Sequence, residues 1–164
     1  MIRRKNKNYN ELVKYITDNQ ERLYKFAYTY VKNQQEALDI VQESIYKALS
    51  SINTLKNIDY MKSWLYKIII NTSINHIRKT KRVIVIDELN DKYECKEDDL
   101  DSNIDLYEAI DKLDENQKTI VVLRYFEDMK IEDIAKTIDC NISTVKSRLY
   151  SALDKLKIIM NEGV

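Results

Sequence analysis

The 164-residue sequence contains no proline and a single glycine, Gly163. Proline and glycine are the strongest breakers of regular secondary structure, so their near absence leaves few positions suited to tight turns. Long stretches of Lys, Ile, Leu and Glu favour helices instead. One run, TIVVLRYF, has the propensity of a strand, but its length and the helical runs on both sides favour a buried helix. The sequence therefore predicts an all-α fold.

Cysteine and histidine are also scarce. Cys95 and Cys140 lie far apart and form no Cys-x-x-Cys pair, and His76 is the only histidine. Neither a disulfide framework nor a metal site is expected from so few residues, and no cofactor is expected either. An enzyme is not expected, because the sequence has no glycine-rich phosphate loop, no metal-ligand spacing and no histidine beside a nucleophile.

Long hydrophobic runs are missing. No apolar stretch approaches the roughly 20 residues that span a bilayer, and the basic start, MIRRKNKNYNELV, is not followed by an apolar core of signal-peptide length. Hydrophobic residues still make up 44% of the chain, which is enough to build a core. We therefore expect a folded cytoplasmic protein with reduced cysteines.

A net charge of either sign is absent as well, because 27 Lys and Arg balance 27 Asp and Glu. Their distribution is uneven: residues 62–82 hold six bases and no acids, whereas residues 87–115 hold thirteen acids and three bases. Within the acidic span, NDKYECKEDDLDSN has almost no apolar periodicity and is typical of a flexible tether. We predict two small helical domains, residues 1–86 and 105–164, joined by an acidic linker at 87–104. RVIVIDEL, which leads into the linker, fits a short strand or an extended segment equally well.

The segment EALDIVQESIYKAL has the period of an amphipathic helix. Its core stripe is predicted to comprise Leu38, Val41, Ile45, Ala48 and Leu49. Asp39, Gln42, Glu43 and Tyr46 cluster on the adjoining flank, and Ile40 is expected to point away from the core. An acidic, polar and aromatic face suits docking on a basic protein surface, although an ordinary solvated helix face remains the alternative.

A second segment, SWLYKIIINTSINHIRKTKR, is apolar in its first half and polar, then basic, in its second. Its polar residues, whose amides and hydroxyls can bond base edges, are Asn71, Thr72, Ser73, Asn75 and His76. Arg78 and Lys79 can neutralise phosphates, and Trp64 and Tyr66 offer stacking faces to unpaired bases. The alternatives are a core tryptophan and a basic helix end that merely favours the helix dipole.

Near the C-terminus, KIEDIAKTIDCNISTVKSRLYSALDKLK contains two short apolar-periodic runs joined by a break. The second run should bury Ile142, Val145, Leu149, Ala152, Leu153 and Leu156. Its outward residues are predicted to be Ser147, Tyr150, Ser151 and Asp154, with Lys146 and Arg148 on the flanks. Asn141 or Ser143 can cap this helix, and Cys140 or Asn141 occupies the position where many such turns use glycine. This pattern favours a DNA-binding helix-turn-helix over a plain helical hairpin.

Three motifs in this order resemble the extracytoplasmic-function (ECF) group of sigma-70 factors: DIVQESIYKAL, SWLYKIIINTSINHIR and LDENQKTIVVLRYFEDMKIEDIAKTIDCNISTVKSRLYSAL. The resemblance covers most of the chain apart from the acidic segment. It implies sigma region 2 in the first domain and sigma region 4 in the second. The implied function is an alternative sigma factor that binds core RNA polymerase and directs initiation at stress-responsive promoters.

The resemblance also implies roles for individual residues. Asp39, Gln42 and Glu43, with Tyr46 beside them, match the surface that binds the clamp helices of the polymerase β′ subunit; contacts to β are implied as well. The implied −10 contacts are Asn71 and Asn75, and the stacking and basic residues Trp64, Arg78 and Lys79 complete the predicted −10 surface. The implied −35 contacts are Arg124, Lys146, Ser147 and Arg148, and Ser143, Thr144 and Tyr150 complete the predicted −35 surface. The partners are therefore polymerase, promoter DNA and an anti-sigma factor, often membrane-anchored in this family, with no small-molecule substrate.

The sequence departs from the family pattern at four positions. Ser151 and Leu153 stand where some relatives have arginine, which predicts fewer phosphate contacts. Lys130 replaces a Ser or Thr cap, and Asn75 is not a residue type that the family fixes. Two other classes of protein stay open: a stand-alone helix-turn-helix regulator that binds operators as a dimer, and a helical interaction protein with no DNA role. The first would not need the face formed by Asp39, Gln42, Glu43 and Tyr46.

Overall fold

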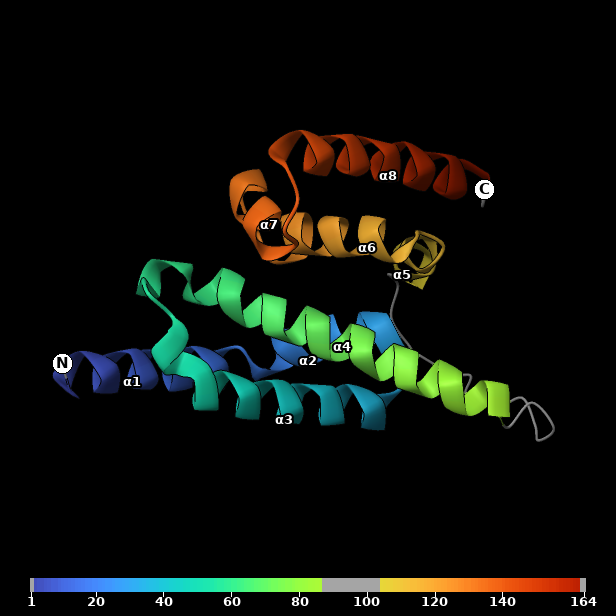
Figure 1. Ribbon diagram of the computed structural model, residues 1–164. Helices are drawn as coiled ribbons and strands as arrows, with labels where there is room; N and C mark the ends of the chain where they lie inside the picture. Colours follow the sequence, from blue (N-terminus) through green and yellow to red (C-terminus); the bar gives the residue numbers. More distant parts are fainter. Residues whose placement is uncertain (1, 87–103, 163–164) are drawn as a thin grey trace. The chain divides into compact units, whose positions relative to one another are not determined.

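The computed structural model describes residues 2–86 and 104–162, and all regular structure within them is helical (Figure 1). The all-α prediction is therefore confirmed for these residues. The chain divides into two compact units, Met1–Glu94 and Cys95–Val164. The predicted acidic linker spans residues 87–104. Residues 87–103 lie outside the described part of the chain, and Ile104 begins a helix. Of the ambiguous RVIVIDEL segment, the residues up to Ile86 continue a helix.

The described residues of the first unit form four helices and two short 3-10 turns (Figure 1). The helices are α1 (Ile2–Asp18), α2 (Gln20–Val31), α3 (Gln34–Ser51) and α4 (Met61–Ile86). The turns η1 (Ile52–Thr54) and η2 (Ile58–Tyr60) connect α3 to α4. α3 packs against both α2 and α4, and α2 also contacts α4, so the three helices surround one core.

Large apolar side chains from all four helices fill this core. Those with almost no exposed surface are Leu12, Leu23, Phe26, Ile40, Leu65, Tyr66 and Ile69. The rings of Phe26 and Tyr66 meet edge to face, with centroids 4.9 Å apart and an interplanar angle of 89°. This arrangement brings the positive edge of one ring to the negative face of the other and fixes α4 against α2.

A two-residue connection sets the direction in which α3 leaves α2. Lys32 adopts the left-handed conformation (φ 51°), and its N–H bonds the main-chain oxygen of Tyr28 at 2.8 Å. Asn33 is extended, and its Oδ1 accepts a 3.0 Å hydrogen bond from the N–H of Glu36. Lys32 thus satisfies a carbonyl at the end of α2, and Asn33 satisfies an amide at the start of α3. Both helix ends are therefore capped within two residues.

The second unit is built around α8 (Ile142–Glu162), which packs against α5 (Ile104–Asp111), α6 (Glu115–Val121) and α7 (Ile131–Thr137). Asp114 caps α6, because its Oδ1 accepts a 2.8 Å hydrogen bond from the N–H of Gln117. The helix predicted for TIVVLRYF is confirmed, since this segment forms the end of α6 and the turn that follows it. Residues 119–123 are buried as predicted, but Tyr125 and Phe126 are exposed.

That turn, η3 (Val122–Phe126), is π-helical, which the sequence pattern does not predict. The N–H of Glu127 bonds the oxygen of Val122, five residues earlier, at 3.2 Å. Asp128 then takes a positive φ of 51°, and the N–H of Met129 returns to the oxygen of Leu123 at 3.0 Å. These bonds end the helix compactly and turn the chain toward α7.

The turn between α7 and α8 is closed by a pair of main-chain bonds. The N–H of Ile138 bonds the oxygen of Ile134 at 3.0 Å, and the N–H of Cys140 bonds the oxygen of Ala135 at 2.9 Å. The second bond places Asp139 at the left-handed position of a Schellman motif, with φ 54°. The expectation that Cys140 or Asn141 takes this conformation was therefore wrong, because the motif follows from where α7 ends.

α8 begins at Ile142, so Asn141 occupies the capping position and Ser143 lies inside the first turn. Ile142 is 43% exposed and does not belong to the buried stripe, contrary to the sequence prediction. Of the other predicted core positions of α8, Val145, Leu149, Ala152 and Leu156 are buried, whereas Leu153 is only half-buried. None of the helices formed by the described residues has the length and apolar character needed to cross a membrane.

Candidate functional site

The outer face of α3 carries the first group of candidate residues. Asp39, Gln42, Glu43 and Tyr46 are all exposed, and Tyr46 retains 73% of its surface. Gln35, one turn before Asp39, donates a 3.1 Å hydrogen bond from its Nε2 to Asp39 Oδ1. The face thus presents two carboxylates, an amide and a large aromatic ring to solvent, as the sequence predicted.

The core stripe of α3 differs from the prediction. Ile40 is fully buried and Leu38 is 45% exposed, the reverse of what was expected. The buried residues of α3 are Ala37, Ile40, Val41, Ser44 and Ala48. Three of these five are small, which lets α2 and α4 approach α3 closely. The prediction gave weight to large apolar residues and so placed the stripe too far round the helix. As a result, the exposed aliphatic residue beside the acidic face is Leu38.

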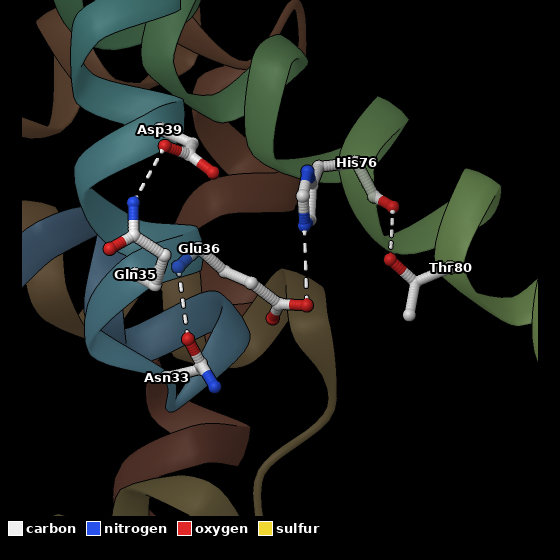
Figure 2. Close-up of polar contacts among 6 residues, drawn as sticks. All are labelled: Asn33, Gln35, Glu36, Asp39, His76 and Thr80. Carbon is white, nitrogen blue, oxygen red and sulfur yellow. Dashed lines mark hydrogen bonds and ion pairs between the residues drawn. The ribbon is translucent and has the colours of Figure 1, made fainter.

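Polar contacts fix the start of α3 against α4 (Figure 2). Besides the Asn33 cap, Glu36 reaches across to α4, where its Oε1 lies 3.6 Å from Nε2 of His76. Nε2 of His76 is buried and makes no hydrogen bond. Thr80 donates a 2.9 Å hydrogen bond to the main-chain oxygen of His76, one turn back along α4. The Glu36–His76 contact joins the start of α3 to the polar half of α4, and each of the other two bonds is local to one helix.

A continuous polar stripe runs along α4. Trp64, Asn71, Asn75 and Arg78 are spaced seven, four and three residues apart, so they lie on one side of the helix. Asn71, Asn75, Arg78 and the adjacent Lys79 are exposed, whereas Trp64 is half-buried. The structure therefore brings the five predicted −10 residues together on one helix.

Three other residues of α4 were expected to reach nucleic acid but are buried. Tyr66 has no exposed surface, because its ring packs against Phe26, and it offers no stacking face. Thr72 and Ser73 are also buried, and Ser73 donates its hydroxyl to the oxygen of Ile69 at 2.7 Å. The Ser73 hydroxyl is thus satisfied within its own helix, as is common for buried Ser and Thr side chains.

A groove lies between the second halves of α3 and α4, with a volume of about 270 Å³. Its lining residues are Glu43, Lys47, Thr72, Asn75, His76, Arg78, Lys79 and Arg82. Lys47 lies 2.9 Å from Glu43 Oε1 and 3.3 Å from Thr72 Oγ1. Sequence reasoning missed Lys47, and the only available signal was its position four residues after Glu43.

The −35 candidates gather on the second unit, mostly on α8. Ser143, Lys146, Ser147 and Tyr150 are exposed, and Thr144 and Arg148 are half-buried. Arg148 Nη1 lies 3.5 Å from Cys140 Sγ in the preceding turn, where the guanidinium donates to the sulfur. α7, the Schellman turn and α8 thus form the predicted helix-turn-helix, with small and basic residues facing outward.

Arg124 belongs to the π-helical turn η3 and not to the helix-turn-helix itself. Its Nη1 donates a 2.9 Å hydrogen bond to the main-chain oxygen of Met129. Ser151 and Asp154 are exposed, as predicted, and Ser151 Oγ accepts a 3.3 Å hydrogen bond from Gln117 Nε2 of α6. In the described residues, no group of three or more His, Cys, Asp or Glu side chains is arranged to hold a metal ion.

Two family models match the chain, one on each unit. The model for sigma-70 region 2 matches residues 15–83, and the model for sigma-70 region 4 matches residues 104–156. The RNA polymerase sigma factor SigV of Bacillus subtilis is 48% identical over 148 residues, which cover 90% of this chain and 89% of the relative. The chain is an ECF sigma factor of the sigma-70 family.

Further relatives agree with this assignment. The ECF RNA polymerase sigma-E factor of Haemophilus influenzae is 30% identical, covering 73% of the sigma factor described here and 71% of the relative. Among solved structures, the sigma factor RpoE of Bartonella quintana, in complex with the anti-sigma factor NepR, superposes with a TM-score of 0.77. That likeness covers 92% of this chain and 97% of the other at 23% identity, and it shows a shared fold.

The family assignment settles the class of function. This protein is an alternative sigma factor that directs transcription, and the comparisons give no support to a stand-alone dimeric regulator. The helix-turn-helix lies within the part matched by the region 4 model, and the acidic face of α3 and the polar stripe of α4 lie within the part matched by the region 2 model.

Proposed function

We propose that this sigma factor binds core RNA polymerase through the face of α3 formed by Asp39, Gln42, Glu43 and Tyr46, on the β′ clamp helices. The stripe of α4 engages the melted −10 element of stress-responsive promoters, and α8 with Arg124 engages the −35 duplex. The protein acts in the cytoplasm as a specificity subunit and contributes no catalytic step. Residues 1–86 and 105–164 are the two binding domains, and residues 87–104 connect them.

The observation that supports docking through α3 is the exposure of Tyr46 beside the acidic residues Asp39 and Glu43. Its side chain keeps 73% of its surface exposed, so a large aromatic ring is available for a partner protein to cover. Aromatic residues provide much of the binding energy at protein interfaces, and flanking carboxylates select a basic partner. Leu38, exposed on the same helix, extends the apolar part of this surface.

The two promoter-binding surfaces contain few cations each, and the whole chain has no net charge. Because affinity for DNA depends strongly on the number of phosphates neutralised, each unit alone should bind promoters weakly. Specific binding then requires both units to act together on polymerase, where the two promoter elements are presented at once.

An anti-sigma factor is a further proposed partner. RpoE of Bartonella quintana was solved with the anti-sigma factor NepR, and CnrH, which superposes with a TM-score of 0.69 at 16% identity, was solved with the cytosolic domain of CnrY. We infer a corresponding regulator of this protein, membrane-anchored in keeping with the family resemblance. It would cover the exposed faces of α3 and α8 and so keep the sigma factor from polymerase and DNA.

The docking surface is tested with the double variant Asp39→Arg and Glu43→Arg. Reversing two exposed charges should abolish co-elution with core polymerase, because both side chains would then face basic groups. The matched control, Asp18→Arg and Glu21→Arg, makes the same charge change at exposed positions outside the proposed face and should co-elute normally. Retained binding by the Asp39–Glu43 variant would show that polymerase docks elsewhere.

Promoter selection is tested by run-off transcription on sheared genomic DNA with core polymerase, in the presence or absence of the protein. Discrete new transcripts should appear only with the wild-type chain, and aligning their start sites would reveal both promoter elements. Polymerase binding without any new transcript would contradict the proposed role of α4 and α8.

A further inference from the structure

The groove between α3 and α4 concentrates positive charge. Four of its lining residues are Lys or Arg, namely Lys47, Arg78, Lys79 and Arg82, and only one, Glu43, is acidic. Lys47 is the one cation contributed by α3, and the other three lie on α4. The sequence motifs assigned no role to Lys47, although it faces the same groove as Arg78 and Lys79.

Lys47 is held by one neighbour on each helix. Its Nζ lies 2.9 Å from Glu43 Oε1 within α3 and 3.3 Å from Thr72 Oγ1 across the groove. Thr72 is buried, so the ammonium group is anchored at the wall of the groove, while its side chain keeps 43% of its surface exposed. An ammonium has three donors, and two are directed at these neighbours, which leaves one for a ligand.

These groups fit a phosphate. Several cations around an open groove favour a ligand with more than one negative oxygen, and phosphate oxygens accept several charge-assisted hydrogen bonds at once. Asn75 and the anchored Lys47 add donors at one end of the groove, and Arg78 and Arg82 continue along α4. A nucleic-acid backbone or a free polyphosphate supplies this chemistry.

We propose that this groove is a phosphate-binding site in which Lys47 is a direct ligand and Glu43 is a competing internal counter-ion. The proposal rests on the proposed docking of Glu43 on polymerase. When a basic group of polymerase engages Glu43, Lys47 loses its intrahelical partner but keeps its bond to Thr72. Its charge then becomes available to a backbone phosphate of the promoter strand, so that polymerase binding strengthens DNA binding.

The size of this coupling is limited by the strength of the ion pair. Glu43 and Lys47 are both about half exposed, and such pairs contribute little in water. Releasing Lys47 should therefore raise affinity for a strand about two- to fivefold at low salt. Coupling between two sites is reciprocal, so a bound strand should raise affinity for polymerase by the same factor.

The test measures binding of the whole chain to a labelled oligothymidine by fluorescence anisotropy over a range of salt concentrations. Lys47→Met should weaken binding and make the slope of log affinity against log salt shallower by about 0.7, the loss of one phosphate contact on a single strand. Lys47→Arg keeps the charge and should restore the slope. Lys25→Met is the matched control, because Lys25 forms the same type of pair with Glu21 on α2 at 3.0 Å. An unchanged slope for Lys47→Met would overturn the site.

The counter-ion role is tested with Glu43→Gln. This variant should bind the oligothymidine about two- to fivefold more tightly than Glu21→Gln, which makes the same charge change on α2. The gain should disappear when Lys47→Met is added, because the freed cation is then missing. Equal effects of Glu43→Gln and Glu21→Gln would show that net charge alone, and not release of Lys47, affects binding.

Two further measurements separate the alternatives. If inorganic triphosphate displaces the oligothymidine from the wild type but not from Lys47→Met, the site also accepts free polyphosphates; if it displaces neither, the ligand is the strand backbone. Binding of Glu43→Gln to core polymerase is measured independently. Normal polymerase binding with altered DNA binding would overturn the docking assignment and leave the phosphate site standing. Weaker polymerase binding with unaltered DNA binding would overturn the phosphate site and leave the docking assignment standing.

Discussion

Nη1 of Arg124 donates a 2.9 Å hydrogen bond to the main-chain oxygen of Met129. This bond ties the π-helical turn η3 to the segment that leads into α7, the first helix of the helix-turn-helix. The family resemblance assigned Arg124 to the −35 element, so the same side chain also has a structural task. A promoter defect of an Arg124 variant is thus open to two explanations, and measurements of stability are needed to separate them.

Replacing Arg124 with Met should lower the free energy of unfolding of the second unit by about 1–2 kcal/mol. The substitution removes a charged donor from the main-chain oxygen of Met129, which lies just before α7. Thermal unfolding of the whole chain, followed by calorimetry, measures the change. Arg148→Met is the comparison, because the bond of Arg148 goes to the weakly accepting sulfur of Cys140. Equal losses of stability for both variants would mean that the bond to Met129 stabilises the unit no more than the bond to the Cys140 sulfur.

Asn33→Ala should destabilise the first unit by about 1 kcal/mol, because it removes the oxygen that caps the N–H of Glu36 at the start of α3. Asn33→Gly should cost only a few tenths of that, since glycine is itself a tolerated cap. Urea unfolding of the three proteins gives the comparison. Identical midpoints for Asn33→Ala and the wild type would show that the cap does not stabilise α3.

Asp128→Gly should stabilise the second unit, by up to about 1 kcal/mol. Asp128 has φ 51°, a conformation in which the Cβ of aspartate imposes a steric cost. Glycine has no Cβ and adopts this conformation freely. The same substitution at Asp154, an exposed position inside α8, should instead cost about 1 kcal/mol, because glycine weakens a helix interior. The two melting temperatures should therefore move in opposite directions, and movement in the same direction would refute the backbone argument.

Lys146→Glu with Arg148→Glu should abolish transcription from a promoter that has a −35 element while leaving binding to core polymerase intact. The double change reverses two charges on the outward side of the helix-turn-helix, where phosphates are expected. Lys155→Glu with Lys157→Glu changes the net charge equally, further along α8. Run-off transcription compares the two variants. If both lose activity alike, the defect comes from net charge and not from the −35 surface.

Much of the fold and several exposed surfaces could be predicted because they depend on local properties of the chain. The lack of proline and the spacing of apolar residues predict helices, which the described residues confirm. A surface residue needs only to avoid the core stripe, so the exposure of Tyr46 on α3 and of Tyr150 on α8 followed from periodicity. The contacts that these surfaces make with polymerase and DNA stay predictions.

The tertiary structure alone decided which side of each helix a neighbour covers. Ile40 is buried and Leu38 exposed because α2 and α4 both approach α3 over its small residues. The periodicity of α3 alone does not show where these two helices lie. The left-handed conformation of Asp139 and the contact of Lys47 with Thr72 likewise depend on where helices end and meet. Sequence by itself determined the helices and their polar faces, since these follow from local periodicity. Packing between segments distant in the chain decided the groove and its held lysine, because such contacts exist only once the helices have assembled.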